Sequence, residues 1–194
     1  MNNVEEIAVL RTLIDILDNL NIAYAIGGSM ASSVYGAVRF TQDADITVEP
    51  FSTAADKLYL ALQKDFYVSK NAISQAVQNR SSFNVIHLTT AFKIDIFIMA
   101  NEEFRKQIFS RRKKLPLGEA TEKPLSFVSP EDIVLLKLDW YKKTGCLSEC
   151  QWSDILGVLN AGGTEIDIEY LKSWAEKLGI AELLEKAVSD SSEQ

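Results

Sequence analysis

Apolar residues recur along this chain at two different spacings, and these spacings indicate where helices alternate with strands. Residues 3–20 carry an apolar side chain every three or four positions, which is the spacing of one helix face. A short apolar run at 22–26 and a β-branched run at 43–49 have the composition of strands. A short helix over 29–35 fits between them. The first quarter of the chain therefore predicts a helix followed by a strand–helix–strand unit.

The middle of the chain continues this mixture of helix and strand. Residues 52–64 and 101–112 predict helices, and the runs at 82–88 and 92–99 predict two strands joined by a hairpin-length loop. This order of elements favours an α+β fold, in which helices flank a small mixed sheet.

The last third of the chain reads as helical. Ser129-Pro130-Glu131-Asp132 is a helix start, with serine as the N-cap, proline at the first position and acids in the first turn. We expect helices at about 130–143, 148–160, 167–178 and 180–189, separated by glycines. The chain length favours either one domain with an appendage or two small domains. With the pattern of elements, we expect a sheet-containing domain over 1–128 and a helical domain over 129–194.

The composition narrows the class of protein. Of the 194 residues 47% are hydrophobic and 24% charged, and the formal net charge is -7 at pH 7. This charge argues against broad electrostatic binding of nucleic acid or of an anionic membrane. Because the chain has no run of eighteen apolar residues and no signal-peptide pattern at its start, we expect a cytoplasmic protein. Its two cysteines and one histidine are too few for a usual structural zinc site.

Two acids open the second strand run. Asp43 and Asp45 are two residues apart, so in a strand their side chains share a face, with Cα atoms roughly 7 Å apart. Like charges on one face repel unless a cation lies between them, and Mg²⁺ is bound by carboxylates together with substrate phosphates. The pair therefore predicts a magnesium site. The alternative is a solvated turn at the strand entry, where aspartate is common.

A glycine-rich turn precedes these acids. Gly27, Gly28 and Ser29 follow the first strand run and lead into the short helix. Glycines permit a tight turn, and the backbone N–H groups at a helix N-terminus bind anions. The turn therefore predicts a phosphate site, and its alternative is a plain strand-to-helix connection. A phosphate site together with a metal site indicates nucleotide chemistry.

A third acid lies inside an apolar strand run. Asp95 stands between isoleucines in residues 94–98, and a buried carboxylate without a partner is costly. In the structural interpretation, Asp95 lies on a solvated face or pairs with Lys93. In the functional interpretation, Asp95 is a third metal ligand on a strand next to Asp43 and Asp45. Adjacent strands lie roughly 4.8 Å apart, so three carboxylates could meet around two ions.

Taken together, Gly27-Gly28-Ser29, Asp43-Ala44-Asp45 and Asp95 resemble the nucleotidyltransferase superfamily with the DNA polymerase beta-like palm. The stretch Arg39-Phe40-Thr41-Gln42-Asp43-Ala44-Asp45 is similar to the Arg-x-Thr-x-Asp-x-Asp stretch of its minimal bacterial members, which include abortive-infection toxin nucleotidyltransferases. The resemblance extends from about residue 7 to 188. It implies a palm domain followed by a helical unit, and it does not specify a substrate.

The resemblance also implies roles for particular residues. Asp43, Asp45 and Asp95 would be catalytic and would bind two Mg²⁺ ions, with Mn²⁺ as a substitute. The NTP would be bound by Gly27, Gly28, Ser29, Arg39 and Lys137. For Arg39 the alternative is a salt bridge across its loop, and for Lys137 it is a surface helix lysine. We expect Lys137 to line the cleft as an exposed lysine, so that its replacement by alanine weakens NTP binding and barely changes the melting temperature.

The activity implied by the resemblance is metal-dependent transfer of a nucleoside monophosphate from an NTP to an acceptor hydroxyl, with release of pyrophosphate. The acceptor would be an RNA such as tRNA, a protein or a small molecule. A role as the toxin of a toxin–antitoxin pair would add an antitoxin partner. The alternative is a catalytically silent protein of the same fold that binds a nucleotide or a partner.

Overall fold

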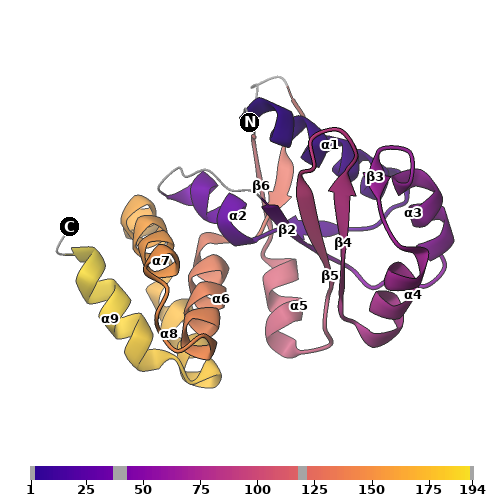
Figure 1. The fold of residues 1–194 in the computed structure, drawn as a ribbon. Coiled ribbons are helices and arrows are strands. Elements are labelled where there is room, and N and C mark those ends of the chain that lie inside the picture. The colour runs from indigo at the N-terminus through magenta and orange to yellow at the C-terminus, as the bar shows by residue number, and fades with distance from the viewer. Residues whose placement is uncertain (1–2, 37–42, 118–121, 193–194) are drawn as a thin grey trace. The chain divides into compact units, whose positions relative to one another are not determined.

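The computed structural model describes residues 3–36, 43–117 and 122–192 (Figure 1). Within these ranges the chain forms two compact units. The first unit contains a mixed sheet with flanking helices, and the second contains only helices. The α+β fold expected from the sequence, with a mixed sheet and a helical C-terminal part, is confirmed.

The sheet of the first unit has the strand order β3-β4-β5-β2-β1-β7-β6 among the described residues. Strands β2 and β5 run parallel at its centre, β1 is antiparallel to β2, and β4 is antiparallel to β5. The strands are β1 (Tyr24–Ile26), β2 (Asp43–Val48), β3 (Phe66–Tyr67), β4 (Ser82–His87), β5 (Lys93–Ile98), β6 (Lys113–Leu115) and β7 (Leu125–Phe127).

The central strands bury one face, as the alternation of their side chains requires. On β2 the side chains of Ala44, Ile46 and Val48 are buried, and on β5 those of Ile94 and Ile96 are buried. The helices of the first unit, which contribute their own apolar faces to this core, are α1 (Asn3–Asn19), α3 (Ala55–Leu62), α4 (Lys70–Asn79) and α5 (Glu103–Ser110).

The second unit combines helices from two distant parts of the sequence. Helix α2 (Gly28–Tyr35) packs against α6 and α7 (Figure 1). The approach is close, because a Cβ on Gly36 would lie 2.6 Å from the backbone carbonyl carbon of Gly157. The other helices are α6 (Pro130–Lys143), α7 (Glu149–Gly162), η1 (Gly163–Glu165), α8 (Ile168–Leu178) and α9 (Ala181–Ser192).

The start of α6 has the capping arrangement that the sequence predicted. The Ser129 side chain accepts a hydrogen bond from the N–H of Asp132, and Pro130 occupies the first turn. This cap satisfies one of the donors that a helix start leaves without an intrahelical partner. Among the described residues, none of the helices has the length and apolar character needed to cross a membrane.

Candidate active site

The pairing of β2 with β5 brings the three candidate acids to one face of the sheet. Asp45 is the register partner of Asp95, and Asp43 is the register partner of Lys93. Register partners on neighbouring strands point to the same side, and residues two apart on one strand do so as well. Asp43, Asp45 and Asp95 therefore share a face, opposite to the buried isoleucines.

This face is open to solvent at the level of the acids. Asp43 is exposed, while Asp45 and Asp95 are half-buried. On the other side of β5, Asn84 of β4 is the register partner of Asp95 and is also exposed. Asp45, Asp95 and Asn84 thus form one row of oxygen-bearing side chains across three strands. Nothing in the sequence singled out Asn84, because its place in the row depends on the β4–β5 register.

A lysine lies among these acids. The Nζ of Lys93 is 2.7 Å from Oδ2 of Asp95, and the two form an ion pair. The hydrogen bond that Lys93 donates to Asp95, together with the negative charges of Asp95, Asp43 and Asp45, raises the pKa of Lys93. The pairing with Lys93 that the sequence offered as one explanation of Asp95 is therefore present. A metal-binding role for Asp95 stays a prediction.

The donor atoms on this face suit a hard divalent cation. Carboxylate oxygens are the ligands that Mg²⁺ prefers, and the neighbouring strands that carry Asp45 and Asp95 lie roughly 4.8 Å apart. Over the described ranges, no three side chains of His, Cys, Asp or Glu are placed so as to hold a metal ion. The fit to magnesium thus rests on donor type and on the shared face, and in this arrangement the ammonium group of Lys93 contacts an oxygen of Asp95.

The glycine turn begins where β1 ends. The N–H of Gly27 donates to the backbone carbonyl oxygen of Asp45 at 2.8 Å, which ties the turn to β2. Gly28 has a φ of 57°, a left-handed conformation that favours glycine. Ser29 lies in the first turn of α2, where backbone N–H groups point out of the helix end. The local structure is therefore of the type that binds anions, and phosphate binding stays a prediction.

Arg39 and the residues Phe40, Thr41 and Gln42 that follow it lie outside the described residues. Both interpretations of Arg39, the phosphate contact and the salt bridge, remain predictions.

Lys137 is buried, and the expectation of an exposed lysine is wrong. Only 6% of the residue is exposed. Its Nζ donates to Oδ2 of Asp154 at 2.8 Å and to Oε1 of Gln151 at 2.9 Å. The hydroxyl of Ser32 on α2 donates to the same Asp154 oxygen at 3.4 Å. The side of α6 that carries Lys137 is enclosed by neighbouring helices, and its charge is balanced inside the second unit.

Asp154 and Ser32 were not singled out by the sequence reading. A signal was available, because Gln151 and Asp154 are three residues apart and thus share a face of their helix. The partner lysine, however, lies on a different helix, and only the packing of α6 against α7 reveals the pair.

Two further acids are buried at the start of α6. Asp132 accepts hydrogen bonds from the hydroxyl groups of Tyr170, at 2.6 Å, and Ser129, at 2.9 Å. Glu131 accepts a hydrogen bond from the N–H of Asp167. Burial and the negative charges of both acids raise the pKa of Tyr35. The sequence identified these acids as first-turn residues of a helix, and their burial follows from the packing of α2 and α8.

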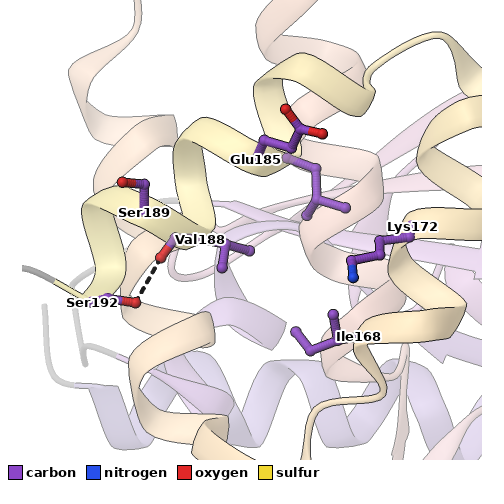
Figure 2. A pocket seen from close by; sticks show the side chains of 7 residues that line it. Ile168, Lys172, Glu185, Val188, Ser189 and Ser192 are labelled. Atoms are coloured by element: carbon purple, nitrogen blue, oxygen red, sulfur yellow. Dashed lines mark hydrogen bonds between the residues drawn. The ribbon is translucent and has the colours of Figure 1, made fainter.

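A cavity of about 460 Å³ lies between α8 and α9 in the second unit (Figure 2). Its charged residues, Lys172 and Glu185, are exposed, and the Ser192 hydroxyl donates to the carbonyl oxygen of Val188. The remaining lining residues are Ile168, Leu184 and Ser189. Because the lining is mainly apolar and its charges are solvated, we assign no chemistry to this cavity.

Comparison with known proteins supplies the context for these residues. No protein-family model and no curated protein sequence matches the chain. A solution structure of the antibiotic-resistance factor ANT(2'')-Ia is similar over 96% of this chain and 98% of its own, with a TM-score of 0.60 and 13% identity. An antigenic nucleotidyltransferase-like protein from Paracoccidioides brasiliensis is similar over 97% of this chain and 94% of its own, with a TM-score of 0.56 and 19% identity.

This chain has the nucleotidyltransferase fold. The resemblance carried by the glycine turn and the acids is therefore confirmed at the level of the fold. A crystal structure of ANT(2'')-Ia in complex with adenylyl-2''-tobramycin is similar as well, over 89% of this chain and 98% of its own, with a TM-score of 0.60 and 13% identity. Within this nucleotidyltransferase fold, Asp43, Asp45 and Asp95 occupy the open face of the central parallel strand pair.

Proposed function

We propose that this protein is a metal-dependent nucleotidyltransferase that transfers a nucleoside monophosphate from an NTP to an acceptor hydroxyl. The observation that carries the proposal is the β2–β5 register, which places Asp45 beside Asp95 with Asp43 on the same face. The fold supports it, because ANT(2'')-Ia shares that fold and was crystallised with a tobramycin derivative bearing an adenylyl group.

In the proposed reaction the acceptor oxygen attacks the α-phosphorus of the NTP. The bond between the α-phosphorus and the bridging oxygen breaks, and pyrophosphate leaves with that oxygen. Two Mg²⁺ or Mn²⁺ ions bound by Asp43, Asp45 and Asp95 would neutralise phosphate charge and lower the pKa of the acceptor hydroxyl. Asp95, on the neighbouring strand, would accept the proton of that hydroxyl.

The triphosphate needs donors of its own. The N-terminus of α2 would bind the β- and γ-phosphates through the backbone N–H groups of Gly28 and Ser29, with Gly27 fixing the turn. Lys137 already directs two of its three N–H groups to Gln151 and Asp154, which leaves at most one for a phosphate oxygen. Arg39 completes the proposed set of phosphate contacts.

A small molecule is the acceptor that we favour. The support is the adenylylated tobramycin bound by ANT(2'')-Ia, and the net charge of -7, which is unfavourable for an RNA acceptor. A tRNA or a protein hydroxyl is the second choice, and it would accompany a toxin role with an antitoxin partner.

The proposal is tested by incubating the protein with each of the four α-labelled NTPs and with Mg²⁺ or Mn²⁺. Three acceptor pools are offered separately: total RNA, total protein and a small-molecule extract supplemented with hydroxyl-rich antibiotics. We expect label in one pool together with pyrophosphate. Asp45→Asn, which keeps the shape and removes the charge, should lower the rate at least about a hundredfold. Absence of both label and pyrophosphate under all conditions would contradict the proposed activity.

One observation favours a second function, that of a nucleotide-binding protein without turnover. The ion pair between Lys93 and Asp95 involves the carboxylate that catalysis requires. A silent protein would bind an NTP, detected by calorimetry, and would release no pyrophosphate in the assay above.

A further inference from the structure

Lys93 is the cation nearest to the proposed catalytic acids that the described contacts reveal. It is the register partner of Asp43, lies two residues before Asp95 on β5, and holds Oδ2 of Asp95 at 2.7 Å. Its side chain is 43% exposed and that of Asp95 is 23% exposed, so the pair lies at the surface of the open face. Within the described contacts of this face, the ammonium group of Lys93 lies beside one of the three carboxylates, that of Asp95.

We propose that Lys93 is a counter-ion that competes with the divalent metal for Asp95, so that metal binds together with the nucleoside triphosphate rather than before it. This inference rests on the proposed function. It adds to the three acids a role for Lys93, which is to occupy Asp95 until metal and triphosphate bind together. In this scheme Lys93 acts on the metal through Asp95 and, once released, contacts the triphosphate itself.

The competition follows from the geometry. An oxygen that accepts a hydrogen bond from an ammonium group at 2.7 Å cannot bind a metal ion in the same direction. Two cations that share one carboxylate also repel each other. A metal ion that binds to the protein without nucleotide must therefore break the contact between Lys93 and Asp95. Because the acids repel one another, either the ammonium group or a metal ion is favoured beside them.

The triphosphate changes this balance. It brings several negative charges to the same face, so the ammonium group released from Asp95 gains a new anionic partner. Lysine carries its charge on a flexible four-carbon stem, and it can change partners without movement of β5. Binding of metal and binding of triphosphate then favour each other, and this coupling is reciprocal.

The alternative is a surface ion pair with no functional consequence. The chain supplies a matched example in Lys70 and Asp56, whose atoms are 2.9 Å apart on helices of the same unit, with side chains 56% and 75% exposed. Lys70→Met removes one charge from a lysine–aspartate pair away from the acid face, and thus controls for the change in net charge.

The test measures two affinities in the whole 194-residue chain. Mn²⁺ is titrated by paramagnetic resonance without nucleotide, and an NTP analogue with a methylene bridge between its α- and β-phosphates is titrated by calorimetry in EDTA. For Lys93→Met we expect Mn²⁺ to bind about tenfold more tightly and the analogue to bind about tenfold more weakly. Lys70→Met should change each affinity less than about twofold.

The two affinities should change in opposite directions. A lysine with a purely structural role would not strengthen the binding of Mn²⁺ while weakening the binding of the NTP analogue. Lys93→Arg, which keeps the charge, should retain most of the wild-type behaviour. If Lys93→Met and wild type bind Mn²⁺ equally, the competition is overturned and the proposed activity stands. If neither protein binds Mn²⁺, even with the analogue present, the metal-dependent function fails together with the inference.

Discussion

At the scale of single residues, the ion pair of Lys137 and Asp154 is notable for its burial. Both side chains are about 95% removed from solvent, with exposures of 6% and 5%. Removing charges from water is costly, and only the partner and further hydrogen bonds offset that cost. Here Gln151 and Ser32 supply such bonds. Loss of Lys137 would remove the ion pair and, with it, much of what offsets the burial of the Asp154 charge.

We therefore predict that Lys137→Ala destabilises the protein by about 3–5 kcal/mol. Thermal unfolding of purified variants measures this. Lys143→Ala is the control, because Lys143 lies on the same helix and forms an exposed pair with Asp139. Its loss should cost less than about 1 kcal/mol. Equal and small shifts in both melting temperatures would show that Lys137 is not buried as described.

At the scale of elements, much of the sheet could be predicted from the sequence. The strand runs and the shared face of Asp43 and Asp45 follow from alternation with a period of two. The partnership of Asp45 with Asp95 was a hypothesis, because the two acids lie fifty positions apart in the sequence and local pattern does not fix the pairing of distant strands. The ion pair of Lys93 could be anticipated as an alternative, since both residues lie on one strand.

The packing of the helices against one another could not be predicted from the sequence. Pattern identified α2, α6 and α7 as helices, but helical periodicity does not say which helix covers which. The close approach of α2 to α7 depends on Gly36, whose missing side chain leaves room for the backbone of Gly157. A single glycine between two apolar segments carries no such signal when read alone.

We predict that Gly36→Ala lowers stability by about 1–3 kcal/mol, because the added Cβ would meet backbone atoms that cannot rotate away. Gly162→Ala is the comparison. There a Cβ would lie 2.5 Å from a side-chain carbon of Ile166, which can change rotamer. Urea unfolding should show the larger loss for Gly36→Ala. A reversed order would mean that α2 and α7 adjust freely at this contact.

At the scale of the whole molecule, the two units do not coincide with two continuous halves of the sequence. The sequence predicted a boundary near residue 128, and the helices from Pro130 onward do form one unit. Helix α2, however, belongs with them although it lies near the N-terminus. The reason is physical, because its buried residues Met30, Ala31 and Ser32 pack on helices that follow a hundred residues later.

A fragment of residues 1–128 should consequently keep the sheet and lose α2. An isolated helix of eight residues is marginal in water, and this one would have its buried face exposed. We predict that hydrogen exchange in the fragment is fast over α2 and slow over β2 and β5. In the full chain, both regions should be protected. Slow exchange over α2 in the fragment would show that this helix does not need the C-terminal helices.

This arrangement constrains how such a protein can diverge. The peptide between Gly27 and Gly28 joins a strand of one unit to a helix of the other, and the chain later returns to complete the sheet. A recombination event with one crossover near residue 128 would provide new C-terminal helices but retain an α2 fitted to the old ones. A successful exchange must replace α2 together with the C-terminal helices. This requires additional crossovers on both sides of α2. Divergence of the helical unit should therefore arise more readily by substitution within it than by its replacement.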